Sequence, residues 1–545
     1  MEPNAIARRL TLPLTAVGRG VTTLDTLRRA GLLDPRAALA GAEAFVRWRA
    51  SAAAAVSAAA RRHPGRDAFV DDDGRLTFAE LDEVSTNVAG ALRDRGVDET
   101  ARVGILCRNH RGLVVTLLAA SKLGADVVLL NTELAAGPLA EIVEREEIDL
   151  LAHDADLVDA TGSVAASVTR IVADRPTGPD DGTDVLSVPD LCAVSHGELP
   201  RPARDGALVL LTSGTTGVPK GARRGRPPAD PLAVAGLLEL LPYRAGDVIV
   251  VAPPLFHALG MSQCQMAPLM GSTLVVHRRF DAEATLRTLA AERATVLAAV
   301  PVMLRRLLAV DPAVRDSLDL SALRMVVCSG SALPPTLAEA WLDTFGENLH
   351  NLYGSTEVAQ AAIATPSDLR AAPGTVGRAP HGTRIRVLGP DDEPVPAGVS
   401  GRVFVGSGFA FEGYTGGTTR AVIDGLMSTG DVGHLDDDGR LFIDGREDDM
   451  IVSGGENLYP REVELLLEGL DGVAEVVVVG VPDEEYGERL RAVVVRVEGA
   501  DLDEDTVRDH ARANLGRFKV PRDVVFIDDL PRNPAGKVLR NELRS

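Results

Sequence analysis

LTSGTTGVPKG, at residues 211–221, is the stretch that most strongly decides how this chain of 545 residues is interpreted. It follows the apolar run at 207–211, which predicts a buried strand. Glycines and small hydroxyl residues let the backbone approach a polyphosphate and donate to its oxygens, and Lys220 adds a positive charge. The pattern therefore indicates a loop that cradles a triphosphate, with a flexible Ser/Thr/Gly loop as the alternative.

The lysine of this loop is not part of a Walker A motif. That motif requires a glycine, four residues and then Gly-Lys followed by serine or threonine, whereas Gly221 follows Lys220 here. Kinase and ATPase folds that are built on a Walker A loop are therefore disfavoured.

Short β-rich runs alternate with helical patterns on both sides of the loop. Helices are expected at 113–123 and 139–147, and strands at 103–107, 126–130, 208–211, 248–251, 273–276, 296–299 and 325–328. This alternation is typical of βαβ units on mainly parallel sheets. We therefore expect an α/β fold from about Ala68 onward.

The pattern changes after about Gly374. Short strands between Gly/Pro turns are expected at 384–388, 401–405 and 441–443. A charged linker follows at 447–449. Beyond it, helices are expected at 461–468 and 504–513, and strands at 474–479 and 491–497. The predicted fold class is α/β: a large N-terminal domain with two mainly parallel α/β subdomains plus a β-rich subdomain, and a small α+β C-terminal domain.

Residues 1–62 are predicted to form a helical N-terminal extension that ends at the turn of His63, Pro64 and Gly65. Its leucines follow helical spacing, as at Leu24 and Leu27. A helical cap on the protein surface is one interpretation. Weak contact of its arginine-rich face with a membrane surface is the other.

Charge and cysteine content limit the partners and the compartment. With 57 basic and 78 acidic residues the net charge is −21, which argues against nucleic acid, because phosphate neutralisation requires a basic face. The four cysteines form no CxxC pair, which argues against a zinc site or a disulfide framework. A cytoplasmic protein is expected, since Arg8, Arg9 and Arg19 interrupt the first apolar run before it reaches signal-peptide length, and the apolar stretch 51–60 is too short to span a bilayer.

The loop at 211–221 resembles the phosphate-binding signature of the adenylate-forming superfamily, which holds acyl-CoA synthetases, peptide-synthetase adenylation domains and luciferases. Further motifs similar to those of the family follow in order: YGSTE at 353–357, STGD at 428–431, GREDD at 445–449 and PAGK at 534–537. The similarity runs from about Asp67 to Arg540. It implies an AMP-binding domain at 63–445 and a mobile C-terminal domain at 446–545.

The resemblance implies that ATP is bound by residues of the loop at 211–221 and of the motifs at 353–357, 428–431 and 445–449, together with Ser331 and Asn351, which resemble the adenine-binding edges. The implied set is Thr212, Ser213, Gly214, Thr215, Thr216, Lys220, Ser331, Asn351, Tyr353, Gly354, Ser355, Asp431 and Arg446. The carboxylate of Asp431 accepts hydrogen bonds only, as the two ribose hydroxyls require. A β-turn aspartate is the alternative.

Three residues are implied in the chemistry at phosphate. Thr356 resembles the threonine that contacts the α-phosphate, and Glu357 supplies the hard anionic oxygen that Mg²⁺ prefers. A helix cap is the alternative for Glu357. Lys537 resembles the catalytic lysine: a carboxylate that attacks the α-phosphate builds an anionic transition state, which a cation between the two groups stabilises.

Transfer of the acyl group to coenzyme A requires further groups. Asp448 aligns with the family hinge, about which the small domain rotates. Gly454 and Gly455 resemble the loop that lines the pantetheine tunnel, where glycines admit a thin chain. His257 resembles the gating aromatic between the acyl pocket and the tunnel, and a buried, hydrogen-bonded structural histidine is the alternative.

The function expected is that of an ATP-dependent acyl-CoA synthetase with Mg²⁺ and coenzyme A, acting on medium- or long-chain fatty acids. Activation of an aryl or specialised acid, with transfer to an amine or a carrier-protein thiol, is the first alternative. A non-catalytic nucleotide binder is the second, and the joint presence of Lys220, Glu357, Asp431, Arg446 and Lys537 argues against it. The sequence does not determine the oligomeric state.

Overall fold

The computed structural model gives the fold of most of the chain. The residues that it describes are 25–174, 186–212, 220–224, 231–408, 411, 413–415, 417, 419–453, 456–483, 487–515, 519–534 and 536–544. Four sheets organise these residues, three in the larger part of the chain and one after residue 450.

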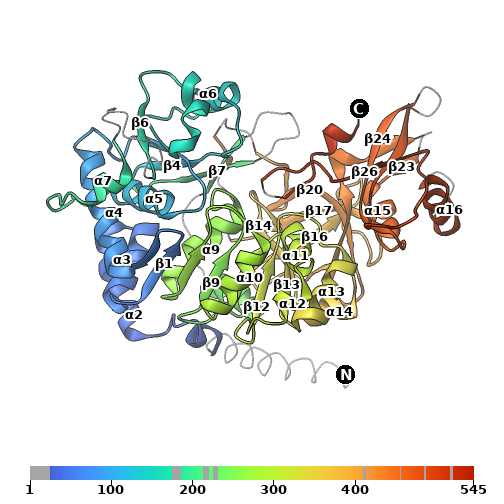
Figure 1. Ribbon diagram of the computed structural model, residues 1–545, viewed down its shortest axis with the longest axis horizontal. Coiled ribbons are helices and arrows are strands. Elements are labelled where there is room, and N and C mark those ends of the chain that lie inside the picture. Colours follow the sequence, from blue (N-terminus) through green and yellow to red (C-terminus); the bar gives the residue numbers. More distant parts are fainter. Residues whose placement is uncertain are drawn as a thin grey trace, which may run out of the picture.

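An eight-stranded sheet forms the centre of the molecule (Figure 1). Its inner strands are parallel, and antiparallel strands lie at both edges. The order is β14 (Ala359–Ala364), β13 (Leu349–Ser355), β12 (Met325–Cys328), β11 (Val296–Ala299), β9 (Val248–Val251), β10 (Thr273–Val276), β1 (Asp67–Asp71) and β2 (Gly74–Thr77). Every residue of β10, β11 and β12 is buried, as the uninterrupted apolar runs predicted for strands covered on both faces.

A seven-stranded sheet carries the predicted phosphate loop. Its order is β18 (Gly413–Tyr414), β8 (Lys220–Arg224), β7 (Leu208–Thr212), β4 (Asp126–Leu129), β3 (Arg102–Leu106), β5 (Leu150–His153) and β6 (Thr169–Val172). The strands from β7 to β6 are parallel, whereas β8 and β18 add an antiparallel edge that the sequence did not predict. This edge joins residue 414 to the phosphate-loop region.

Helices cover these two sheets and fill the space between them (Figure 1). They are α2 (Pro35–Trp48), α3 (Ala52–Arg62), α4 (Phe78–Arg93), α5 (Arg111–Leu123), α6 (Ala136–Arg145), α7 (Val188–Cys192), α8 (Pro231–Leu240), α9 (Ala258–Leu269), α10 (Ala282–Ala291), α11 (Pro301–Leu308), α12 (Pro312–Arg315), α13 (Pro335–Phe345) and α14 (Pro366–Ala371). Helix α3 packs against α4, α5 and α9, so it shares one hydrophobic core with both sheets. The division of the chain at residue 62 stays a prediction.

An antiparallel sheet follows, as the short strands and turns predicted. It contains β15 (Thr375–Gly377), β21 (Leu441–Arg446), β20 (Leu426–Leu435), β17 (Gly401–Gly406) and β16 (Arg384–Leu388), with β19 (Val422–Ile423) paired to β20. A β-rich subdomain is therefore present.

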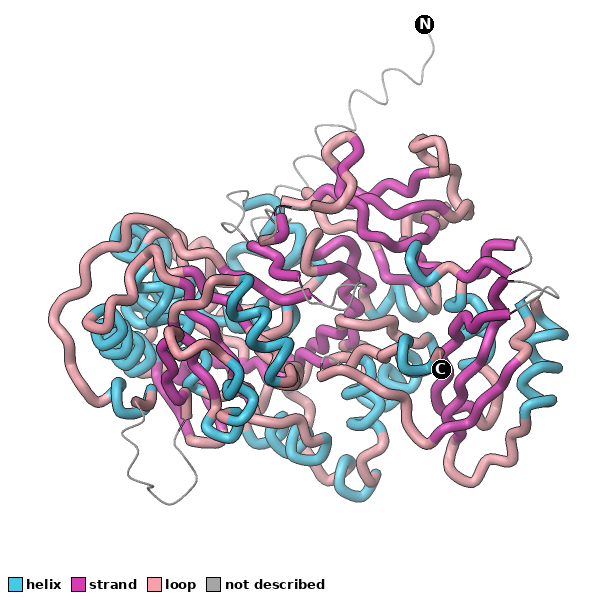
Figure 2. Tube along the Cα trace, turned by 90° about the horizontal axis from the view of Figure 1, so that it is seen from above, coloured by secondary structure: helices cyan, strands magenta, loops and turns pink. Residues whose placement is uncertain are grey.

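The C-terminal part has a sheet and a hydrophobic core of its own. Its elements are β22 (Ile451–Ser453), β23 (Glu456–Leu458), α15 (Pro460–Glu468), β24 (Val473–Asp483), β25 (Gly487–Arg496), α16 (Glu504–Asn514) and β26 (Asp523–Ile527). Figure 2 shows these strands as a separate group beside the C-terminus, and in Figure 1 they lie at the end of the molecule opposite α2 and α3. The predicted small α+β domain is thus confirmed.

All four cysteines lie in the part of the chain that the structure describes. All four cysteines are free thiols, and burial raises the pKa of Cys192 to about 11 and that of Cys264 to about 12, so both stay protonated near neutral pH. Among the described helices, none is both long and apolar enough to cross a membrane.

Candidate functional site

The predicted site residues converge at the carboxyl ends of β12 and β13, where ligands bind in parallel α/β sheets. Asn351 is the register partner of Cys328, the last residue of β12, so Asn351 lies beside the turn that carries Ser331. The chain then continues through Tyr353 to Ser355 at the end of β13. The turn after β12 and the end of β13 therefore lie at the same edge of the sheet.

A tyrosine and an aspartate join this edge to the β-rich sheet. The Tyr353 hydroxyl donates a 2.5 Å hydrogen bond to Oδ2 of Asp431, and Nη1 of Arg446 lies 3.3 Å from Oδ1. Burial raises the pKa of the Asp431 carboxyl above its ordinary value, and the positive charge of Arg446 opposes that rise. Asp431 and Arg446 face each other across β20 and β21, so the pairing of two strands brings these two predicted residues together.

Glu357 is a buried carboxylate that is held in its charged form. Burial acts to raise its pKa, but hydrogen bonds from the hydroxyls of Tyr414 and Ser355 outweigh burial and lower the pKa below the ordinary value. Tyr414 donates to Oε1 over 2.5 Å, and Nη2 of Arg420 lies 3.9 Å from the same oxygen. The backbone N–H of Glu357 itself donates to Oγ of Ser355, which fixes the turn after β13.

Lys220 is linked to Glu357 through the side chain of Tyr414. Its Nζ lies 5.6 Å from the centre of the Tyr414 ring, whose hydroxyl reaches Glu357. Thr212 and Lys220 are register partners across β7 and β8, and they flank the predicted phosphate loop. Ser213, Gly214, Thr215 and Thr216 of that loop lie outside the described residues.

Two residues of the site were missed by sequence reasoning. Tyr414 and Arg420 lie in a glycine- and threonine-rich stretch with no periodic pattern, and β18 is only two residues long. The one available signal was the isolated aromatic between glycines in the segment 413–417.

The arginines of the site gather at the STGD turn. A Cβ added to Gly430 would lie 2.7 Å from Nη1 of Arg420 and 3.4 Å from Nη2 of Arg446, so the glycine leaves room for two guanidinium groups. Together with Lys220, these groups place three cations around the carboxylates of Glu357 and Asp431. Such an arrangement suits a polyphosphate with a divalent metal ion and a pair of hydroxyl groups.

The predicted catalytic lysine follows a turn that packs on the large domain. The N–H of Lys537 donates to Oδ1 of Asn533 over 2.9 Å, and its carbonyl accepts from the N–H of Asn533 over the same distance. Gly536 has φ +76°, and a Cβ there would lie 3.1 Å from Cγ2 of Val300. A Cβ on Gly330 would lie 3.2 Å from the other methyl group of Val300. The turn before Lys537 and the turn after β12 therefore pack on one side chain.

His257 precedes α9 and has no hydrogen-bond partner at Nε2 among the described residues, although that atom is buried. Burial lowers the pKa of His257 to about 4, so the ring is neutral near pH 7. Its ring centre lies 4.5 Å from that of Phe256. The unpartnered Nε2 does not fit a fully hydrogen-bonded structural histidine, and it leaves one polar atom for a ligand.

The remaining predicted residues lie at the domain connection. Asp448 lies in the 3-10 turn Glu447–Asp449, between β21 and β22. Thr356 lies between Ser355 and Glu357 at the end of β13, whereas Gly454 and Gly455 lie outside the described residues.

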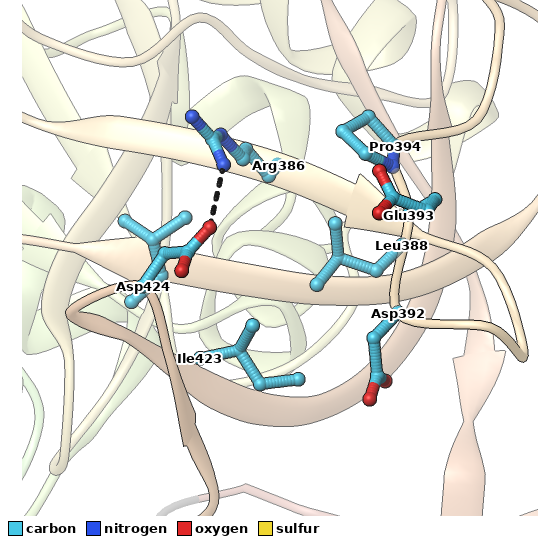
Figure 3. Close-up of a pocket in the computed structure, with 8 residues that line it drawn as sticks. Arg386, Leu388, Asp392, Glu393, Pro394, Ile423 and Asp424 are labelled. Atoms are coloured by element: carbon cyan, nitrogen blue, oxygen red, sulfur yellow. Dashed lines mark hydrogen bonds and ion pairs between the residues drawn. The ribbon is translucent and has the colours of Figure 1, made fainter.

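A hollow of about 250 Å³ on the β-rich sheet contains none of these residues. Figure 3 shows its lining, in which Arg386 and Asp424 form an ion pair of 3.3 Å above apolar side chains. Its volume is below the range of roughly 300–1,000 Å³ that is usual for a small-molecule site.

Comparison with known proteins agrees with this geometry. A family model of the AMP-binding enzyme matches residues 56–415, and a model of the AMP-binding enzyme C-terminal domain matches residues 462–537. The chain is similar to an indoleacetate–CoA ligase of Aromatoleum aromaticum, with 35% identity over 494 residues that cover 88% of this chain and 95% of the relative. It is also similar to a feruloyl-CoA synthase of an Amycolatopsis species, with 35% identity over 491 residues that cover 89% and 96%.

Two solved structures share the fold over nearly their whole length. ATP-bound MatB from Rhodopseudomonas palustris has a TM-score of 0.76 and 30% identity, and the match covers 88% of this chain and 95% of MatB. The amide bond synthetase McbA from Marinactinospora thermotolerans has a TM-score of 0.79 and 28% identity, and the match covers 90% and 99%.

Proposed function

The chain belongs to the AMP-binding enzyme family, and from that premise we propose that it is an ATP-dependent acid–thiol ligase. In the first half-reaction a carboxylate oxygen attacks the α-phosphorus of ATP, an acyl-adenylate forms and pyrophosphate leaves. In the second, the sulfur of coenzyme A attacks the acyl carbon, a thioester forms and AMP leaves. The observation that carries this proposal is the meeting of Tyr353, Asp431 and Arg446 beside the edge on which the turn of Lys537 packs.

Each charged group of the site would contact a different part of the nucleotide. Lys220 and Arg420 lie on either side of Tyr414 and Glu357, where they would neutralise phosphate oxygens. Glu357 would hold Mg²⁺, because its carboxylate is charged, buried and able to offer Oε2; when bound, the ion would offset phosphate charge. Asp431 would accept from the ribose hydroxyls, and Tyr353 and Arg446 would hold its orientation.

Lys537 would supply the cation of the first half-reaction. Its side chain is exposed and follows a turn that packs on Val300, the residue after β11, so the ammonium group would lie near the carboxyl ends of β11 and β12. A cation there stabilises the negative charge that builds up between the attacking carboxylate and the α-phosphate. Thr356 would donate to an α-phosphate oxygen from the opposite turn.

The second half-reaction would require the C-terminal domain, residues 446–545, to rotate about Asp448 so that Gly454 and Gly455 line the path of the pantetheine chain. His257 would gate this path, since it has one unpartnered ring nitrogen and packs on Phe256. A neutral, buried ring can change rotamer without desolvating a charge.

The acid is proposed to be apolar, with medium- or long-chain fatty acids as the first class to test. A second class has a specific reason: the two relatives reported above are named for indoleacetate and ferulate, which are aryl acids. For the acceptor, the amide bond synthetase among the similar structures makes an amine the main competitor of coenzyme A.

One panel of reactions tests acid and acceptor together. Pyrophosphate release is measured for fatty and aryl acids, each alone and with coenzyme A, an amine or a carrier protein, and products are identified by mass. The proposal expects acid-dependent pyrophosphate release and a coenzyme A thioester. Release of pyrophosphate without any thioester would remove coenzyme A from the assignment.

We also propose that the enzyme is cytoplasmic and touches an anionic membrane surface through helix α2. The outward side of α2 exposes three large apolar side chains beside the charged Arg36 and Glu43: Leu39, Phe45 and Val46 are each more than half exposed, and Leu33 lies just before the helix. Large apolar side chains that are exposed together on one helix favour a cover. Apolar side chains that enter the interface between lipid headgroups and acyl chains would provide it.

The charge of this region favours an anionic surface as that cover. Residues 1–66 contain eleven arginines and four acidic residues, a net charge of +7, whereas the whole chain carries −21. Negatively charged lipid attracts such a basic segment, and the acidic remainder of the protein would orient away from it.

A further inference from the structure

One carboxylate bridges the two domains. Glu475 lies on β24 of the C-terminal sheet, and its side chain is about nine-tenths buried. Its Oε1 lies 2.9 Å from Nε of Arg305, which is on helix α11 of the large domain. The Arg305 guanidinium also donates to the carbonyl oxygen of Ala474. The large domain therefore holds both the side chain of Glu475 and the backbone next to it.

The second oxygen of Glu475 reaches the turn before Lys537. Nη2 of Arg532 donates to Oε2 of Glu475 over 2.5 Å, and Nη1 of the same arginine donates to the carbonyl oxygen of Gly536 over 2.8 Å. The chain of contacts thus runs from Arg305 through Glu475 and Arg532 to the residue that precedes the predicted catalytic lysine.

The arginines that contact Glu475 are partly shielded from solvent. The side chains of Arg532 and Arg305 are 17% and 35% exposed, so solvent screens their charges less than on an open surface. If the Glu475 carboxylate were neutralised, the guanidinium groups of Arg305 and Arg532 would lose the anion that both of them contact. Because interactions of one partly buried group are coupled in this way, loss of Glu475 should loosen the turn as well as the boundary.

We propose that Glu475 is a positioning residue for the first half-reaction: it docks the turn of Asn533, Gly536 and Lys537 onto Val300 and Val302 of the large domain. This inference rests on the proposed function in that Lys537 is taken as the catalytic cation. Glu475 itself touches neither nucleotide nor acid. Its contacts increase the fraction of molecules in which the turn before Lys537 is docked on the large domain.

Half-reaction kinetics test this role. Glu475→Gln and Arg305→Met should each lower acid-dependent pyrophosphate release by roughly tenfold, the effect of about one close charged contact. Thioester formation from supplied acyl-adenylate should be unchanged or faster, because that step does not require the docked turn. Arg305→Lys should recover most of the lost activity. Arg306→Met is the matched control, since Arg306 is the next residue on α11, is exposed, and forms no ion pair with any described residue.

A cross-link supplies a readout that does not depend on activity. A Cβ on Gly536 would lie 3.9 Å from Cβ of Val302, within the usual range for a disulfide. In a Val302→Cys, Gly536→Cys protein, mild oxidation should form this bond, and adding Glu475→Gln should slow its formation by roughly tenfold.

The outcomes separate the positioning role of Glu475 from the proposed function of the enzyme. Equal losses in both half-reactions, or an unchanged cross-linking rate in the Glu475→Gln protein, would overturn the positioning role and leave a merely structural ion pair. A wild-type protein that releases no pyrophosphate with any acid would instead contradict the proposed function, while the cross-linking rates would still decide whether Glu475 docks the turn.

Discussion

The hydroxyl of Tyr353 donates to the carboxylate of Asp431 over 2.5 Å, and this contact joins the end of β13 in the central sheet to β20 in the β-rich sheet. Two motifs separated by 78 residues meet in one hydrogen bond. Because Asp431 also lies 3.3 Å from Arg446, its orientation is set by one neutral and one charged donor. A bound ribose would therefore meet a carboxylate that is already oriented.

Asp431→Asn should weaken the use of ATP. The amide keeps the size of the side chain but replaces one acceptor oxygen with a donor, which cannot accept from a ribose hydroxyl. We expect the KM for ATP to rise by at least roughly tenfold, with a smaller change in kcat. Initial rates of pyrophosphate release over a range of ATP concentrations measure both constants. An unchanged KM would show that Asp431 does not contact the nucleotide.

Tyr414→Phe should raise the magnesium requirement. The phenol hydrogen bond holds Glu357 in its charged form, and the loss of such an outer partner commonly costs roughly ten- to a hundredfold in metal affinity. The measurement is the Mg²⁺ concentration that gives half-maximal pyrophosphate release. Tyr243→Phe is the matched control, since its buried hydroxyl donates to Gln263 away from the site. Equal magnesium curves for wild type and Tyr414→Phe would argue against Glu357 as the metal ligand.

His257 should make the protein less stable in acid. Its pKa is 6.5 in the unfolded chain and about 4 in the fold, so the folded form binds its proton later as pH falls. The stabilisation is present above pH 6.5 and is lost as pH falls from 6.5 toward 4, with an upper limit on the order of 3 kcal/mol. Chemical unfolding of wild type and His257→Phe at pH 7 and pH 5 measures it. The variant should lose less stability than wild type between these two pH values; equal losses would contradict the assignment.

Phe45→Glu should reduce binding to anionic vesicles. The new charge opposes burial of the α2 face in lipid, so co-sedimentation with vesicles of mixed neutral and anionic lipid should fall several-fold, and salt should weaken the binding of wild type. Val422→Glu is the matched control, because Val422 is similarly exposed on β19. If Phe45→Glu changes the oligomeric state in solution and leaves vesicle binding unchanged, a second copy of the chain covers this face instead.

Sequence periodicity predicted the parts of the fold that are locally encoded. The strands of the central sheet are short, wholly apolar runs such as 296–299 and 325–328, which only burial on both faces explains, and the structure confirms them. The C-terminal α+β unit was predicted on the same grounds. In contrast, β8 and β18 form an antiparallel edge whose pairing depends on a chain segment almost two hundred residues away, and no local pattern reports it.

The same distinction applies to the site. Residues inside family motifs, such as Asp431 and Lys537, could be named from the sequence. Tyr414, Arg420 and Glu475 could not, because each acts through a partner that is remote in the chain: Glu357 for the first two, and Arg305 for the third. Motifs predict the groups that would contact a ligand, whereas the side chains that orient those groups become visible only in the folded arrangement.

The central claim is that the C-terminal domain delivers the Lys537 ammonium group to a nucleotide that is held by the large domain. Lys537→Ala tests it most directly, with three measurements on one protein: ATP binding, acid-dependent pyrophosphate release, and thioester formation from supplied acyl-adenylate. We predict that pyrophosphate release falls by roughly 10²- to 10³-fold while ATP binding and thioester formation are retained. Pyrophosphate release at the wild-type rate would contradict the account.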